Sequence, residues 1–150
     1  MRKHVEGEKI PINISFRSEI HHEGEKEVIS FQTEGHYYIK GNQMFIVFTE
    51  EQPSVGTVNV IYKLSDQEAW VSRAGAIKMR QTYRLGEQTA GIYENELGTF
   101  QLTIETNKMT LMKDDINKRG SFQMEYELTV HGQSAGTYFI TLHYEEVSSI

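Results

Sequence analysis

The sequence predicts an all-β fold, a single antiparallel, up-and-down β-barrel of about 8–10 strands. Apolar and polar residues alternate at a period of two from end to end, short turn signals separate these stretches, and no window carries the spacing of an amphipathic helix. So long a meander must close or leave pairable edges, which favours a barrel over a two-sheet β-sandwich. We expect one domain over residues 1–150, with residues 1–9 flexible or loosely attached.

Three stretches of the sequence, within residues 10–16, 58–64 and 122–130, show which side chains point inward. Their alternate positions hold large apolar residues, while the positions between them are polar, as at Gln123, Glu125 and Glu127. Side chains of this size would fill most of the lumen of a barrel of about eight strands and leave room for at most one small ligand. The predicted inward residues are Ile10, Ile12, Ile14 and Phe16, then Val58, Val60, Tyr62 and Leu64, and finally Phe122, Met124, Tyr126, Leu128 and Val130.

The short turns test this pattern, because residues paired across a hairpin must lie on one face of the sheet. Gly41-Asn42 suits a type II′ turn and sets Tyr38 opposite Phe45. Four further turns keep the apolar face continuous. The predicted pairs are Tyr62 with Trp70 across Ser65–Gln67, Trp70 with Met79 across Ala74-Gly75, Ile104 with Leu111 across Asn107-Lys108, and Tyr126 with Ile140 across Gly132–Ser134.

Composition and charge limit the function classes. The absence of cysteine excludes disulfides, cysteine-containing zinc sites and thiol nucleophiles. The formal net charge of −6 argues against nucleic acid as a partner, since phosphate binding relies on a basic face. The first residues, Met1–Glu6, lack an apolar leader, and the longest apolar run, Met44–Phe48, is far too short to span a bilayer. We therefore expect a cytoplasmic protein that has no membrane partner.

The strand geometry supports neither catalysis nor metal binding. The six histidines are dispersed, and His21-His22 lies in a turn where solvated side chains are the simpler interpretation. Acidic pairs such as Glu50-Glu51 and Asp114-Asp115 lie at strand ends or loops and are interpreted as solvated surface. The sequence contains neither a G-x-S-x-G elbow nor a phosphate-binding glycine loop. We expect no enzyme activity, no metal and no cofactor.

One cluster of inward residues suits ligand binding. Most of its members combine an apolar body with a polar tip, as expected for a small, mostly apolar ligand held at the barrel mouth by a few hydrogen bonds. The alternative is that they only fill the core, with their polar tips bonded to backbone groups. The candidate ligand-binding residues are Tyr62, Trp70, Met79, Gln81, Tyr83 and Tyr126, with Arg73 beside them.

A basic stripe is predicted on the opposite face of the same strands. Arg73, Lys78 and Arg80 share this face, and Arg84 falls at the same parity. The stripe is either an anion-binding strip, on which arginine offers bidentate geometry, or a solvated face whose cations pair with nearby glutamates. The first interpretation would make the protein an interaction module.

The hairpin around Gly41-Asn42 is apolar on both faces. Both Tyr37–Ile39 and Met44–Phe48 lack the polar residues that the outer side of a barrel strand normally presents to water. An outward patch of Tyr38, Phe45 and Val47 therefore indicates a homodimer contact, another protein partner, or cover by the N-terminal segment.

A family pattern runs through the chain. Arg-x-Gly-x-x-x-Met occurs at Arg73, Gly75 and Met79. A tyrosine before a glycine, a strand that closes on threonine and a Tyr-x-Leu strand follow, at Tyr93, Gly98, Thr106, Tyr126 and Leu128. From about Ile12 to Tyr144 the chain thereby resembles the YwiB-like proteins, although Asn95 stands where we expect threonine. The resemblance implies a calycin (lipocalin-like) barrel in a bacterial cytoplasmic protein, and it implies no activity.

Overall fold

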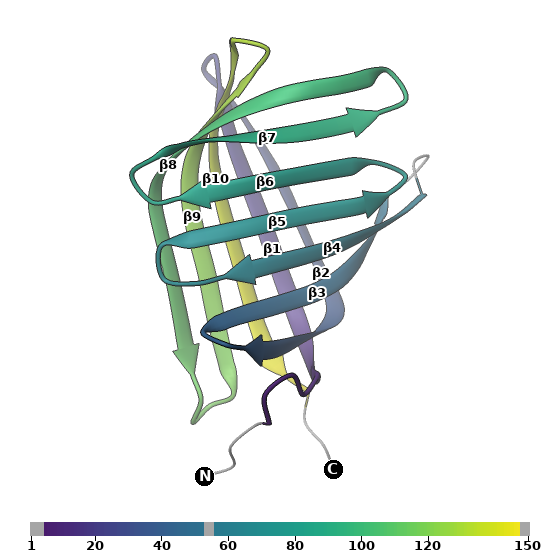
Figure 1. Ribbon diagram of the computed structural model, residues 1–150, viewed down its shortest axis with the longest axis vertical. Helices are drawn as coiled ribbons and strands as arrows, with labels where there is room; N and C mark the ends of the chain where they lie inside the picture. Colours follow the sequence, from purple (N-terminus) through teal and green to yellow (C-terminus); the bar gives the residue numbers. More distant parts are fainter. Residues whose placement is uncertain (1–4, 53–55, 148–150) are drawn as a thin grey trace.

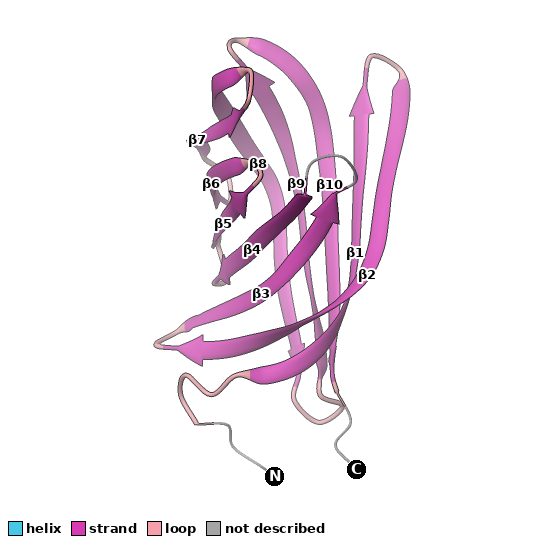
Figure 2. Cartoon of the chain, turned by 90° about the vertical axis from the view of Figure 1, so that its right-hand side faces the viewer, coloured by secondary structure: helices cyan, strands magenta, loops and turns pink. Residues whose placement is uncertain are grey.

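The computed structural model describes residues 5–52 and 56–147, which form ten strands (Figures 1 and 2). Consecutive strands pair antiparallel, and β1 pairs with β10, so that the barrel is closed and the predicted fold class is confirmed. No helix among the described residues has the length and apolar character needed to cross a membrane. The strands are β1 (Ile10–His22), β2 (Glu25–Lys40), β3 (Gln43–Gln52), β4 (Gly56–Leu64), β5 (Glu68–Gly75), β6 (Lys78–Arg84), β7 (Gln88–Asn95), β8 (Gly98–Asp114), β9 (Arg119–Val130) and β10 (Gln133–Glu146).

The wall of the barrel has two parts whose strands run in different directions. In Figure 1, β4, β5, β6 and β7 run across the front, while β8, β9, β10 and β1 run lengthwise behind them. The side chains between these two parts form the core. Ile12, Ile14, Val58, Val60 and Phe122, all predicted to point inward, are buried there. Burial of such side chains is the main force that stabilises the fold.

The turn at Gly41-Asn42 is confirmed. Tyr38 faces Phe45 across it, and Gly41 has a φ of 64°, a conformation that glycine adopts without strain. Residues 5–9 lie beside this hairpin, where the Gly7 amide donates to the Ile39 carbonyl at 2.8 Å. The predicted loose segment 1–9 falls partly outside the described residues, which begin at residue 5.

The predicted turn at Asn107-Lys108 is wrong. β8 continues through this position and the chain turns only after Asp114, so Ile104 faces Leu128 of β9 and not Leu111. The register shifts between Thr106 and Lys108, which leaves Asn107 as the extra residue of a β-bulge. A bulge interrupts the period-two alternation as a turn does, which explains the error.

The predicted pairing across Gly132–Ser134 is wrong by two positions. Tyr126 faces Tyr138, not Ile140, because the hairpin is tighter and a bulge lies between Ser134 and Gly136. A shift by an even number of residues leaves every side chain on its predicted face. The inward face of β9 is therefore as predicted although its partners on β10 differ.

Candidate binding cavity

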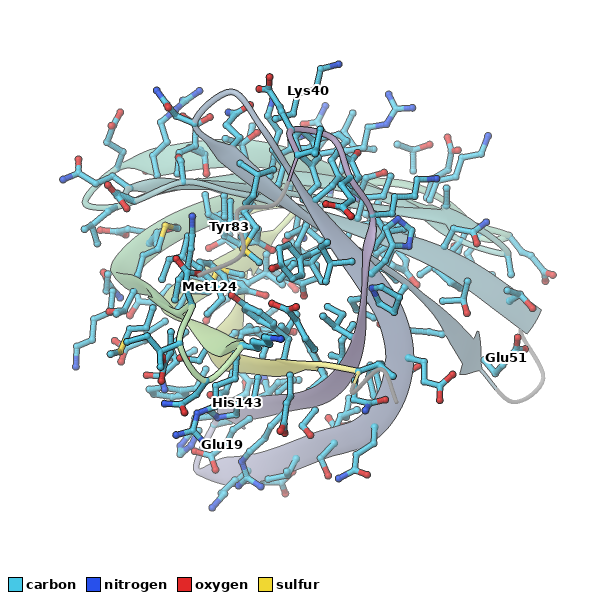
Figure 3. The ribbon with its side chains drawn as sticks, turned by 90° about the horizontal axis from the view of Figure 1, so that it is seen from below. Glu19, Lys40, Glu51, Tyr83, Met124 and His143 are labelled. Carbon is cyan, nitrogen blue, oxygen red and sulfur yellow. The ribbon has the colours of Figure 1, made fainter. Side chains whose placement is uncertain are left out.

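The barrel contains a cavity of about 1120 Å³, to which every strand contributes at least one residue. Ligand sites usually measure about 300–1,000 Å³, so this space is large for a domain of this size. In a view along the barrel, Tyr83 and Met124 point into the lumen while Lys40 points away from it (Figure 3). The inward side chains leave more room than the sequence predicts.

Aromatic rings form much of the cavity wall. The Tyr126 ring centroid lies 4.8 Å from that of Tyr83 and 5.1 Å from that of Tyr138, with an interplanar angle of 14° in the second pair. Phe16 of β1 stacks on Phe31 of β2 at 5.0 Å. Contacts of this kind hold the rings in fixed orientations, so that the wall presents a preformed apolar surface.

A small group of neutral polar side chains lies on the same wall. Tyr62, Gln81, Tyr83 and Tyr126 line the cavity although each is buried, and the Tyr83 hydroxyl donates to Oε1 of Gln81. Burial raises the pKa values of Tyr62, Tyr83 and Tyr126 above the ordinary value of 10. The three phenols therefore stay protonated at neutral pH and can serve as neutral hydrogen-bonding groups.

Arg73 is the one cation on the wall of this cavity among the described residues. An Nη nitrogen of its guanidinium donates to Oε2 of Glu50, and the two side chains are 23% and 13% exposed. Its Nε is buried without a hydrogen-bond partner in the described part of the chain. The pair places a strong dipole and spare N–H donors beside an otherwise apolar space.

Known proteins resemble this chain along most of its length. Residues 14–142 match the family model described as "Domain of unknown function (DUF1934)". The chain belongs to this family. It is 31% identical over 138 residues to the "Uncharacterized beta-barrel protein YwiB" of Bacillus subtilis (strain 168), across 92% of this chain and 95% of that protein. The crystal structure of the ywiB protein from Bacillus subtilis matches with a TM-score of 0.82, at 31% identity and over 93% of this chain and 94% of that one. The predicted resemblance to the YwiB-like proteins is confirmed.

The DUF1934 barrel brings six of the seven predicted ligand-binding residues to the cavity, and Trp70 is the exception. The chain turns at Asp66-Gln67, where the Ser65 amide donates to the Glu68 carbonyl at 2.9 Å, and Trp70 consequently faces Lys63 of β4. On its other side Trp70 faces Thr82 and not Met79, because the next turn lies at Ala76-Ile77 and not at the predicted Ala74-Gly75. The β4–β5 register differs by one residue from the predicted one, which moves every side chain of β5 to the other face. The six residues at the cavity are Tyr62, Arg73, Met79, Gln81, Tyr83 and Tyr126.

The register between β5 and β6 places the four residues of the predicted basic stripe on two different faces of the barrel wall. Arg73 faces Met79 on the inner side of the barrel, so its assignment to the stripe is wrong. Lys78, Arg80 and Arg84 lie on the exposed face of β6, and Nε of Arg84 contacts Oε2 of its cross-strand neighbour Glu68 at 2.8 Å. An ion pair within the sheet reduces the charge that this face offers to an anion.

The sequence interpretation missed several residues of the cavity. Glu50, interpreted as solvated surface, shares the inner face of β3 with Phe48 and pairs with Arg73. Its parity with Ile46 and Phe48 is the signal that could have identified it. Tyr93 and Phe100 face each other across β7 and β8, with ring centroids 6.3 Å apart, and extend the aromatic wall.

Proposed function

We propose that this barrel binds a small, mostly apolar ligand in its lumen, as lipocalin-like barrels do, without catalysing a reaction. The observation that carries the proposal is the cavity of about 1120 Å³, whose wall is mainly aliphatic and aromatic with a few convergent polar groups. This composition is typical of small-molecule sites. Gln81 and the buried phenols would bond a polar group on the ligand, and Arg73 would add a charged donor. A cytoplasmic location is part of the proposal, and it is compatible with a chain that has no cysteine and so needs no oxidising compartment to fold.

The cavity wall also supports a non-catalytic role. Its buried tyrosines are held in the neutral form, and Arg73 and Glu50 are already paired with each other. General acid–base catalysis needs a group that exchanges protons near the working pH, and nucleophilic catalysis needs a nucleophile beside a base. The described residues that line the cavity include no histidine and no such pairing.

Filling the cavity should weaken ligand binding. Met79 lines the lumen, so the indole of Met79→Trp would occupy part of the space; we expect the affinity for the neutral apolar dye N-phenylnaphthylamine to fall about tenfold. Met112→Trp is the matched control, because Met112 is 63% exposed and lies outside this cavity. Fluorescence titration measures both affinities. Native mass spectrometry of protein from a bacterial host should also reveal a co-purified small molecule. Equal dye binding by both variants would refute a site in the lumen.

The second candidate function is homodimerisation through the outer face of β2, β3, β4 and β5. Tyr38 and Phe45 stack there with ring centroids 4.7 Å apart and nearly parallel planes, and Val47 lies one row away. Trp70, now placed on the same face, extends the patch in the row of Phe45 and Lys63. Aromatic residues are enriched in the cores of protein interfaces. Sedimentation equilibrium should show a dimer that Phe45→Glu dissociates; a monomer at high micromolar concentration would exclude this candidate.

A further inference from the structure

β2 leaves one edge unpaired along most of its length. β1 pairs with it from Glu25 to Tyr37, whereas β3 pairs with it only from Gly35 to Lys40. On the side away from β1, residues 25–34 form no backbone hydrogen bond with any other described segment. Every second residue of an antiparallel strand directs its N–H and C=O away from a given partner. Residues 25–34 therefore present a row of unused backbone donors and acceptors.

The unpaired edge of β2 faces a second unpaired edge, which belongs to β3. Thr49–Gln52 pair with β4 on one side, but their pairing with β2 has ended at Phe48. Figure 2 shows the consequence, since β2 follows β1 upward while β3 turns away with β4. We call the space between residues 25–34 of β2 and residues 49–52 of β3 the lateral seam.

The lateral seam communicates with the cavity. Five consecutive residues of β2, Ile29–Thr33, and three of β3, Thr49–Glu51, line the cavity. Only alternate side chains of a strand face the lumen, so an uninterrupted run of lining residues means that the edge of the strand borders the space. Outward-facing residues such as Ser30 and Gln32 contribute for this reason. The cavity thus reaches the exterior along the unused backbone groups.

The β2 edge has the sequence of a strand ready to pair. Val28–Thr33 carries no charge, no proline and no bulge, and Val28 and Ile29 are 40% and 46% exposed. Natural sheets usually protect such an edge with charges, prolines or bulges, because it recruits other chains. The edge is also ordered, since β1 holds β2 from the other side along its whole free length. It is therefore preorganised for a partner strand.

An ion-pair cluster supports the β1–β2 hairpin near its tip. The Glu19 carboxylate accepts hydrogen bonds from His21 at 2.8 Å and Arg17 at 3.1 Å, and Lys26 of β2 lies 3.2 Å away. These contacts, that of His21 first, lower the pKa of Glu19 to about 2. The carboxylate thus stays ionised at neutral pH, and the link from Glu19 to Lys26 helps to hold β2 against β1.

We propose that the lateral seam binds an extended peptide segment, which adds to β2 as a further strand and directs its alternate, apolar side chains into the cavity. The proposal rests on the proposed function in one respect, that the cavity accepts apolar groups. A polypeptide in the extended form repeats its donors and acceptors about every 7 Å, which matches the spacing that the β2 edge offers. Strand addition of this kind takes affinity from the backbone and specificity from pockets for alternate side chains.

Charge favours a basic peptide over a second copy of this chain. The β2 edge carries three carboxylates, Glu25, Glu27 and Glu34, against one cation, Lys26, which pairs with Glu19. Glu51 lies across the seam, and the net charge of the chain is −6. A second copy would bring the same acidic edge, and its inner side chains Ile29 and Phe31 line its own cavity. A separate peptide with lysine or arginine at its ends meets neither obstacle.

Synthetic peptides test the proposal on the full-length protein. We would use acetylated and amidated peptides of about eight residues, with leucine, valine or phenylalanine at alternate positions, threonine between them and lysine at both ends. Amide exchange followed by NMR should show new protection at every second residue from 25 to 34 when a peptide binds. N-methylation of the alternate amides that face β2 removes their hydrogen bonds and should weaken binding about tenfold, while N-methylation of the other set should have little effect.

Two neighbouring positions on β2 supply matched variants. Ile29 faces the inner side and Val28 the outer side, and both are partly exposed, so lysine at either should leave the fold intact. An inward-pointing lysine beside an edge is a natural protection against strand addition. Ile29→Lys should therefore weaken peptide binding about tenfold, while Val28→Lys, with the same added charge, should change it less than about threefold.

The remaining outcomes of the dye, peptide and amide-exchange experiments separate the peptide proposal from the ligand-binding proposal. If the dye binds but no peptide does, the seam is no peptide site and the proposed ligand-binding function stands. If neither binds, both proposals fail. Equal affinity for N-methylated and unmodified peptides would mean that the backbone edge is not used. Protection of residues 25–34 that rises with protein concentration without peptide would assign the edge to a second copy and overturn the proposal.

Discussion

Replacing Gly35 with alanine is expected to destabilise the barrel by about 3 kcal/mol. Gly35 lies on the inner face of β2 opposite Phe48, at the end of the β2–β3 ladder. A Cβ at this position would lie 2.3 Å from the carbonyl oxygen of Val47 and 3.0 Å from the Cβ of Phe48. Because the carbonyl belongs to the backbone, the clash can be relieved only if β3 moves away from β2. That movement weakens the short ladder that joins the two parts of the wall beside the seam.

Equilibrium unfolding in denaturant measures this effect as a change in the free energy of unfolding. Gln32→Ala is the control, since Gln32 is exposed on the outer face of the same strand and its truncation should change stability by less than about 0.5 kcal/mol. If Gly35→Ala is as stable as this control, the close approach of β3 to β2 at Gly35 is not a constraint on the fold.

Much of the fold can be predicted from the sequence because alternation is a local property of each strand. The inward positions of β1, β4 and β9 follow directly from it, and the Gly41-Asn42 turn is marked by a residue that tolerates positive φ. Where no glycine marks the turn, the length of the loop is ambiguous by one residue. Asp66-Gln67 is such a turn, and the ambiguity is enough to exchange the inner and outer faces of β5.

Six of the seven predicted ligand-binding residues also line the cavity, but the size of the cavity and the lateral seam lie beyond this kind of prediction. Whether β2 and β3 stay paired depends on how two strands bend and tilt relative to each other, and neither strand encodes that in its own alternation. β2 pairs on both sides near Tyr37 and on one side near Ile29, although both residues occupy inner-face positions. Arg73 and Glu50 illustrate the same limit, since their contact spans β4 and exists only in the assembled barrel.

Arg73 and Glu50 are expected to act as a coupled pair. Arg73→Met keeps much of the side-chain volume but removes the guanidinium, and so leaves a mostly buried Glu50 carboxylate without this cationic partner. Glu50→Leu leaves the guanidinium without its carboxylate. Either change should cost about 2–3 kcal/mol, somewhat less than the 3–5 kcal/mol typical of fully buried pairs because both side chains are partly exposed. The double variant should lie within about 1 kcal/mol of the parent, since apolar replacements of both partners need no charge compensation.

A double-mutant cycle in denaturant isolates the coupling, and simple addition of the two losses would show that the pair does not act as a unit. A stable double variant also separates the role of this pair in folding from its role in binding. It keeps a cavity lined by Tyr62, Tyr83 and Tyr126, so N-phenylnaphthylamine should bind as tightly as in the parent. Anilinonaphthalene sulfonate, which carries an anionic group, should bind about tenfold more weakly if Arg73 anchors the polar end of the ligand. Equal loss for both dyes would instead assign Arg73 and Glu50 to shaping the cavity wall.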